Sequence, residues 1–264
     1  MKVPRFVMVW CAFLPGAMLA DNRPVGRSFV TRSEVLAQHG IACTSQPLAT
    51  QVALDILKQG GSAVDAAIAA NAMLGVVEPQ NCGLGGDLFA ITWDVASGKL
   101  HGLNASGRSP YALTLAALKA KQIDGKKLEK IPERGPLPVS VPGCVDGWFE
   151  LHRKFGKLPM NRLLAPAIRY AREGFPVSEV IANEWANSVM LLTNQPGFGE
   201  VYLPNRRPPA KGEVFRNPAL ASTLEKIAAE GRDVFYRGDI ARAIETFMKR
   251  HEGFLSARDL AEHK

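Results

Sequence analysis

A glycine-rich turn runs directly into a strand-forming segment at Gln80-Asn81-Cys82-Gly83-Leu84-Gly85-Gly86-Asp87-Leu88-Phe89-Ala90-Ile91-Thr92-Trp93. Residues 94–98 predict a turn, and residues 99–104 predict a second strand that returns beside the first. A dinucleotide-binding loop would need glycine in place of Leu88, and a helix rather than a strand after the loop. The segment therefore predicts a β-hairpin rather than a phosphate-binding loop.

Helical periodicity lies on both sides of this hairpin. Residues 47–59 repeat apolar side chains at helical spacing, and Gly60-Gly61 provides a stop. Ser62-x-x-Asp65 predicts a capping box at the start of an alanine-rich helix. Further helices are expected at 113–122, 145–155, 161–173, 177–190, 219–229 and 240–249, with long loops at 132–143 and 194–217. The expected fold class is α+β.

The composition is that of a folded globular protein. The chain has 264 residues, of which 47% are hydrophobic and 22% are charged. No change in composition marks a second domain. The net charge is +7, but acidic residues are interspersed among the basic ones, so a nucleic-acid partner is not expected.

The N-terminus has the features of an export signal. Lys2 and Arg5 precede an apolar segment at 6–20, and Ala20-Asp21 offers a small-residue cleavage point. The segment is too short for a membrane span and contains Pro15. We therefore expect a signal peptide at 1–20, part of a single domain at 21–264, and a periplasmic or secreted location. Without a functional signal, the location would be cytoplasmic.

Cysteine spacing favours neither a zinc site nor a disulfide framework. The four cysteines, at 11, 43, 82 and 144, form no C-x-x-C pair. With the N-terminal segment removed three remain, an odd number far apart in sequence, and these are expected to be buried small apolar residues. Cys82 lies beside the glycine-rich turn, but no base can be assigned to it as a nucleophile.

The remaining polar residues do not form a recognisable catalytic set. Glu78 and Asp87 flank the glycine-rich turn and are expected to be turn or cap residues. The histidines occur in no metalloprotease or serine-hydrolase motif and are expected at the surface or at helix caps: His39, His101, His152, His251 and His263. Residue types alone therefore predict no catalytic or metal-binding residues.

The order of several short motifs carries the functional inference. The motifs are Thr44-Ser45-Gln46-Pro47-Leu48-Ala49, Gly60-Gly61-Ser62-Ala63-Val64-Asp65-Ala66-Ala67, Glu78-Pro79, Gly83-Leu84-Gly85-Gly86, Asn104-Ala105-Ser106-Gly107-Arg108-Ser109-Pro110, Val141-Pro142-Gly143 and Phe235-Tyr236-Arg237-Gly238. In this order they closely resemble the start of the γ-glutamyltransferase family, from about Ile41 to Lys264.

The resemblance implies an N-terminal-nucleophile hydrolase with a four-layer αββα sandwich, made as a precursor. Such proteins cut themselves before a threonine, which then attacks γ-glutamyl amides such as glutathione with its own α-amine as base. No cofactor is implied. The threonine is expected beyond Lys264, in a small subunit from the same precursor that completes the sandwich. Alone, these residues are therefore expected to be inactive on a γ-glutamyl anilide.

Arg108 is the substrate-binding residue that the resemblance implies. Family members bind the α-carboxylate of the γ-glutamyl group through an arginine in an Arg-Glu-x-x-Pro segment. When Pro110 is aligned with that proline, the arginine position falls on Ser106, and Arg108 is displaced by two residues. In an extended segment this displacement restores the same face. The alternative is a solvated turn arginine.

Two further functions remain open from the sequence. An acylase of the same family would act on another amide, such as a glutaryl-type side chain of a β-lactam. A truncated chain would be a non-catalytic binding or scaffold subunit. The reading frame after Lys264 distinguishes these possibilities, because a Thr-Thr-type junction and a glycine-rich small subunit would restore the enzyme.

Overall fold

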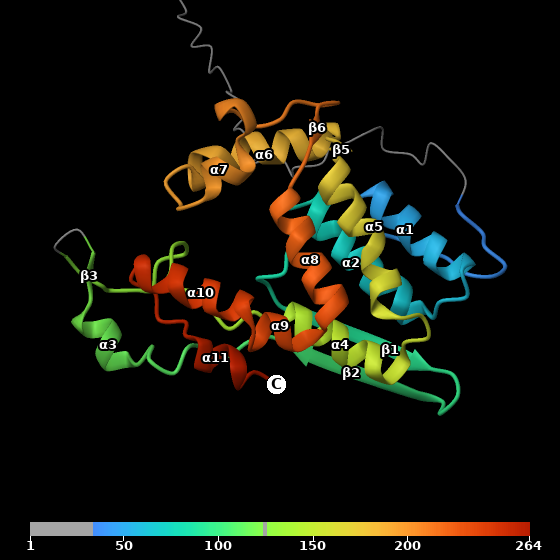
Figure 1. Cartoon of the computed structure of the whole chain (residues 1–264), viewed down its shortest axis with the longest axis horizontal. Coiled ribbons are helices and arrows are strands. Elements are labelled where there is room, and N and C mark those ends of the chain that lie inside the picture. Colours follow the sequence, from blue (N-terminus) through green and yellow to red (C-terminus); the bar gives the residue numbers. More distant parts are fainter. Residues whose placement is uncertain (1–33, 124–125) are drawn as a thin grey trace, which may run out of the picture. The chain divides into compact units, whose positions relative to one another are not determined.

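The structure, a computed structural model, describes residues 34–123 and 126–264 (Figure 1). The predicted signal peptide at 1–20 lies outside the described residues. No helix in the described part of the chain is both long enough and apolar enough to cross a membrane.

Helices dominate the described residues, with small antiparallel sheets between them. The longer helices are α1 Pro47–Lys58, α2 Ala63–Val77, α4 Cys144–Phe155, α5 Met160–Glu173, α6 Glu179–Leu192, α8 Pro218–Glu230 and α10 Asp239–Arg250. The shorter ones are α3 Leu115–Ala120, α7 Phe198–Tyr202, η1 Pro204–Arg206, α9 Arg232–Tyr236 and α11 Ala257–Ala261. The strands are β1 Leu88–Asp94, β2 Lys99–Ala105, β3 Gln122–Ile123, β4 Lys126–Lys127, β5 Phe175–Pro176 and β6 Val214–Phe215. The predicted α+β class is confirmed.

Local sequence rules account for the first two helices. Pro47 occupies the first turn of α1, where its missing N–H costs nothing, and Gly60 adopts φ 87° just after the helix. Ser62 and Asp65 form the predicted capping box at the start of α2. Most residues of α2 are buried, because it packs against α1, α5 and α4. Its many alanines allow this close approach.

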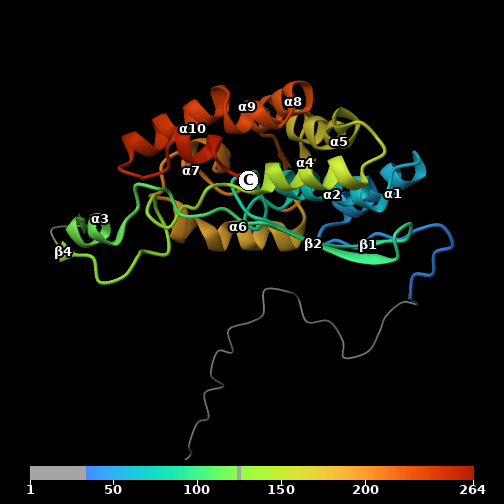
Figure 2. The same cartoon turned by 90° about the horizontal axis from the view of Figure 1, so that it is seen from below.

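The predicted hairpin is also confirmed. β1 and β2 pair in register from Leu88 opposite Ala105 to Asp94 opposite Lys99. One face of the hairpin packs on α4. Figure 2 shows the hairpin on one side of α2 and α4, with α5 and α8 on the other side.

The other face of the hairpin is apolar and exposed within the described residues. Phe89, Ile91 and Trp93 are 67%, 79% and 60% exposed, and Leu100 of β2 is 64% exposed. Side chains alternate along a strand, so these aromatic and aliphatic groups all lie on one surface. We call Phe89, Ile91, Trp93 and Leu100 the outer hairpin face.

Some boundaries differ from those expected. The helix predicted at 177–190 begins at Glu179, because β5 pairs Phe175 with Phe215 of β6 just before it. The helix predicted at 113–122 is limited to Leu115–Ala120. Paired strands of two residues and single-turn helices carry too little periodicity to be recognised from sequence.

Asp65 joins α2 to the loop between α4 and α5. Its carboxylate is fully buried and accepts hydrogen bonds from Ser62 N at 2.8 Å, Lys157 N at 3.0 Å and Leu158 N at 3.2 Å. These backbone donors have no alternative partner if the carboxylate is removed. A buried charge is tolerated here because several N–H groups converge on it.

We predict that Asp65→Ala lowers the free energy of unfolding by about 2 to 4 kcal/mol, because it removes the buried carboxylate that accepts these hydrogen bonds. Urea denaturation followed by circular dichroism measures this change. The matched control is Asp55→Ala in α1, where the carboxylate is half exposed and pairs with Lys58 at 3.5 Å. The control should change stability by less than about 0.5 kcal/mol. Equal losses in both variants would contradict the role given to Asp65.

Candidate functional site

The glycine-rich turn supplies a cap for α4. The carbonyl oxygen of Gly86 accepts hydrogen bonds from Gly143 N at 3.0 Å and Cys144 N at 2.9 Å. Gly143 is the N-cap residue of α4 and has no side chain with which to cap it. The turn at 83–86 therefore satisfies backbone donors that a Ser or Asp side chain satisfies in other helices.

The segment after β2 meets the same helix terminus. Val141 N donates to the carbonyl oxygen of Arg108 at 3.0 Å, and Gly107 N donates to Asp87 Oδ1 at 3.2 Å. A Cβ atom on Gly107 would lie 1.6 Å from the carbonyl oxygen of Val141, and one on Gly143 would lie 1.8 Å from that of Ala105. Only glycine fits at both positions.

Tyr236 of α9 reaches this terminus from the far end of the sequence. Its hydroxyl donates to the carbonyl oxygen of Pro142 at 2.7 Å and accepts from Asp146 N at 3.0 Å. The ring is fully buried, and burial raises the pKa of Tyr236, so the hydroxyl keeps its proton. We call residues 86–87, 105–108, 141–144 and Tyr236 the α4 junction. Most of its residues belong to motifs that carry the family resemblance.

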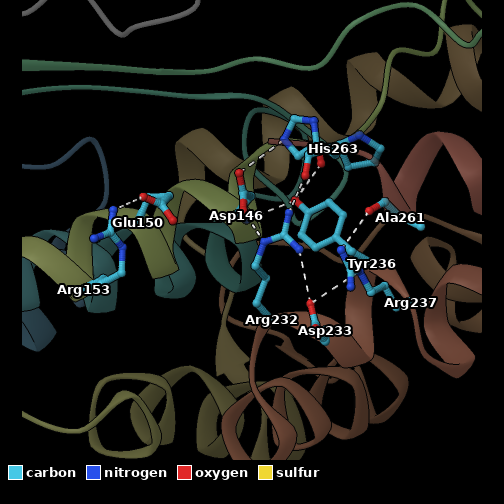
Figure 3. Close-up of polar contacts among 10 residues, drawn as sticks. Asp146, Glu150, Arg153, Arg232, Asp233, Tyr236, Arg237, Ala261 and His263 are labelled. Carbon is cyan, nitrogen blue, oxygen red and sulfur yellow. Dashed lines mark hydrogen bonds and ion pairs between the residues drawn. The ribbon is translucent and has the colours of Figure 1, made fainter.

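An ion-pair network surrounds Tyr236 (Figure 3). Arg232 Nε pairs with Asp146 Oδ1, and Arg232 Nη2 donates to the carbonyl oxygen of His263 at 2.7 Å. The guanidinium lies 4.3 Å from the centroid of the Tyr236 ring, and the His263 ring stacks on the same tyrosine at 5.4 Å. The network attaches the segment after α11 to the start of α4.

All histidines were expected at the surface or at helix caps, and this prediction is wrong for His263, which is buried. It is only 5% exposed, and burial lowers its pKa, which favours the neutral ring. Its Nε2 atom lies 3.6 Å from Asp146 Oδ2. The prediction failed because Tyr236 and Arg232, which enclose the ring, are distant in sequence.

Arg108 is neither free nor merely solvated. Its Nη1 atom donates to Asp259 Oδ1 at 3.0 Å and to the carbonyl oxygen of Ser109 at 2.9 Å. Its guanidinium carbon lies 3.3 Å from the centroid of the Tyr111 ring. The side chain is one-third exposed, and its Nη2 atom is buried without a hydrogen-bond acceptor among the described residues. Arg108 is thus held in place through Nη1, while Nη2 and Nε make no hydrogen bond with the described residues.

Asp259 holds the Arg108 side chain in place, and this role was not predicted from the sequence. It also accepts from Tyr111 N at 2.7 Å and forms a capping box with Ser256 at the start of α11. Burial alone would raise the pKa of Asp259, but hydrogen bonds from Ser256, Tyr111 and Arg108 hold it below its ordinary value. The Ser256-x-x-Asp259 spacing was the only local signal that marked this residue.

Cys82 and Cys144 are not activated as alternative nucleophiles. Burial raises the pKa of Cys144 to about 12, and burial followed by the charge of Glu78 raises that of Cys82. Both thiols therefore stay protonated at neutral pH, and Cys144 Sγ contacts Asn71 Oδ1 at 3.4 Å. Burial was predicted correctly for Cys144, but Cys82 is only partly buried, and the prediction is wrong for Cys43, which is exposed.

The acidic residues beside the glycine-rich turn have loop-holding roles. Glu78 is buried, pairs with the Ser45 hydroxyl and accepts from Asn81 Nδ2 at 2.9 Å. Asp87 binds the backbone of Gly107, as described above. Across residues 34–123 and 126–264, no three His, Cys, Asp or Glu side chains are grouped to hold a metal ion.

Comparison with known proteins assigns the class of this fold. The chain superposes on cephalosporin acylase from Bacillus halodurans with a TM-score of 0.83 and 43% identity, over 92% of this chain and 45% of that chain. It superposes on gamma-glutamyltranspeptidase from Helicobacter pylori with a TM-score of 0.81 and 29% identity, over 88% of this chain and 66% of that chain. The fold is that of the N-terminal-nucleophile hydrolases.

The family follows from the sequence match. The model of the gamma-glutamyltranspeptidase family matches residues 49–264, and the chain belongs to that family. It is similar to oxamate amidohydrolase proenzyme from Klebsiella pneumoniae, with 39% identity over 240 residues, which are 88% of this chain and 44% of that protein. The chain spans less than half the length of this relative and corresponds to the large-subunit portion of the family.

Proposed function

We propose that this chain is the large-subunit portion of a precursor that becomes a threonine-dependent amidohydrolase and acyltransferase. Its donors are small amides that carry a carboxylate, with γ-glutamyl compounds such as glutathione as the first candidates. Family membership supports the reaction class. The observation that supports a carboxylate-bearing donor is Arg108, whose Nη2 atom is buried and has no hydrogen-bond acceptor among the described residues.

The hydrogen bonds of Arg108 define how it would bind a carboxylate. Both hydrogens of Nη1 are used, by Asp259 and by the carbonyl oxygen of Ser109. The donor carboxylate would therefore approach the side of the guanidinium that carries Nη2 and Nε, which have no partner among the described residues, and not the edge that faces Asp259. Asp259 and the Tyr111 ring fix the orientation of the guanidinium before substrate arrives, which lowers the entropy lost on binding.

The chemistry follows from a threonine at a newly formed N-terminus. Its hydroxyl oxygen attacks the amide carbonyl carbon, while the α-amine takes the hydroxyl proton and passes it to the departing amine. The resulting ester is then cleaved by water or by an acceptor amine, which restores the hydroxyl. In this proposal the threonine belongs to the small subunit, and residues of this chain bind and orient the donor.

In the complete protein, the small subunit would pack on the outer hairpin face. It presents Phe89, Ile91, Trp93 and Leu100 on one surface, all more than half exposed. Apolar side chains on both faces of a strand are typical of a sheet buried on both sides. A second sheet from the small subunit would cover this face and give the four-layer sandwich of the family.

A second donor class is favoured by one specific observation. Arg108 is displaced by two residues from the position that the family's Arg-Glu-x-x-Pro segment would give it. The acylase and the oxamate amidohydrolase that this chain resembles are named for other amides. An acylase acting on an amide other than γ-glutamyl, such as a β-lactam side chain, is therefore the alternative.

We predict that Arg108→Ala in the complete precursor lowers kcat/KM for a γ-glutamyl anilide by roughly ten to a few hundred fold, since it removes a charge-assisted hydrogen bond. A donor without the α-carboxylate should lose little. Arg108→Lys should lose part of the rate, because it keeps the charge but not the planar group. Steady-state kinetics on both donors, with self-cleavage followed on gels, measures these effects.

The matched control is Arg258→Ala. Arg258 also lies over the Tyr111 ring, at 5.0 Å, but it is largely exposed and pairs with Glu262. Its kinetics should be unchanged. Equal losses for both donors in Arg108→Ala would show that Arg108 supports the loop instead of the ligand. Higher kcat/KM for oxamate or a glutaryl β-lactam than for γ-glutamyl anilide would favour the alternative donor class.

We also propose export through residues 1–20. The basic start, the apolar segment and the Ala20-Asp21 site support it. Expression in a bacterial host should yield a periplasmic product that begins near Asp21, as shown by N-terminal sequencing. A cytoplasmic product that retains Met1 would refute export.

A further inference from the structure

A cavity lies away from the α4 junction, between the start of the glycine-rich loop and helices α6 and α7. It has a volume of about 80 Å³. Its lining consists of Pro79, Gln80, Trp185, Ser188, Leu192, Phe198 and Tyr202. Sites for drug-sized ligands are several times larger, so this cavity suits a molecule with a single small ring.

The walls of the cavity are aromatic and well anchored. Trp185 is 3% exposed, and its Nε1 atom donates to the carbonyl oxygen of Tyr202 at 2.9 Å. The Tyr202 ring lies 6.0 Å from that of Trp185 and 5.7 Å from that of Phe198. Phe215 packs edge-on against Trp185 at 4.7 Å. These contacts hold the rings in fixed orientations around the space.

One polar residue of the lining, Gln80, gives the cavity chemical selectivity. Gln80 Nε2 donates to Glu184 Oε2 at 2.5 Å. This contact places the amide nitrogen against Glu184 and leaves the carbonyl oxygen, Oε1, at the other branch of the amide. That atom is buried and receives no hydrogen bond from the described residues. A buried acceptor of this kind favours a ligand that brings an O–H or N–H group.

The remaining polar groups reinforce this preference. Ser188 Oγ donates to the carbonyl oxygen of Glu184 at 2.8 Å, which leaves its lone pairs as acceptors. Burial raises the pKa of Tyr202, so its phenol stays neutral. Among the described residues the lining therefore contains neutral polar groups and apolar rings but no charged side chain. Without a cationic side chain it offers no ion pair to a carboxylate, so it favours a neutral occupant.

We infer that this cavity binds a neutral, single-ring aromatic molecule with one hydroxyl or amine donor, such as a phenol. The ring packs among Trp185, Phe198 and Tyr202, and the donor bonds to Gln80 Oε1. This site is separate from the amide chemistry proposed above and does not depend on it. Gln80 begins the loop that ends at Gly86, so an occupant would rest on the segment that caps α4.

The test compares phenol with toluene, which has the same shape but no donor. The probe is the indole N–H resonance of Trp185 in the purified protein, assigned with Trp185→Phe. Phenol should shift it saturably, with a Kd of about 1 mM or below. Phenol should bind roughly three- to tenfold more tightly than toluene, the factor that one hydrogen bond provides.

Two variants and a control complete the experiment. Gln80→Met keeps the side-chain length but removes the acceptor, so phenol should lose its advantage while toluene binds as before. Ser188→Phe should fill the space and abolish binding of both. The control is Met190→Ala, on the same helix but 87% exposed and not part of the lining, which should change neither.

The inference is overturned by either of two results. One is the absence of a saturable shift with phenol up to about 5 mM. The other is a preference for phenol over toluene that survives in Gln80→Met. Circular dichroism of each variant establishes that it is folded before binding is measured.

Discussion

The α4 junction depends on backbone segments that approach too closely for any side chain to stand between them. Gly107 and Gly143 lie where a Cβ atom would be within 2 Å of a neighbouring carbonyl oxygen, as the distances of 1.6 and 1.8 Å show. This close approach lets the carbonyl oxygen of Gly86 accept hydrogen bonds from the backbone N–H groups of Gly143, the N-cap residue, and Cys144, the first residue of α4. The close contact of Gly107 with Val141 also fixes the backbone that leads into Arg108.

The same constraint connects the fold to the proposed chemistry. Because Val141 N is bonded to the carbonyl oxygen of Arg108, the Arg108 backbone is fixed relative to α4. Asp259 then fixes the side chain from α11, and Arg232 with Tyr236 fixes the chain that follows α11. An arginine on a flexible loop would lose more entropy on binding a carboxylate than one held by three structural elements. Several of the motifs that carry the family resemblance therefore meet at the α4 junction, beside Arg108.

Much of the fold could be predicted from the sequence, because its signals are local. The capping box at Ser62, Pro47 at the first turn of α1 and the β1–β2 hairpin all follow from residues a few positions apart. The contacts of the site are different. Asp259 and Arg108 are hydrogen-bonded although they are 151 positions apart, and Tyr236 and Asp146 although they are 90 apart. Local sequence periodicity cannot predict contacts between residues so far apart. The buried state of His263 was missed for the same reason.

The most direct test of this account is the stability of Gly107→Ala against Gly85→Ala. Gly85 lies in the glycine-rich turn, next to Gly86, but a Cβ atom there would meet no atom within 4 Å. Urea denaturation should show that Gly107→Ala lowers the free energy of unfolding by about 2 to 4 kcal/mol, because the added methyl separates the segment at 105–108 from Val141. Gly85→Ala should change it by less than about 1 kcal/mol. Equal stability of the two variants would contradict the claim that close backbone approach builds the site.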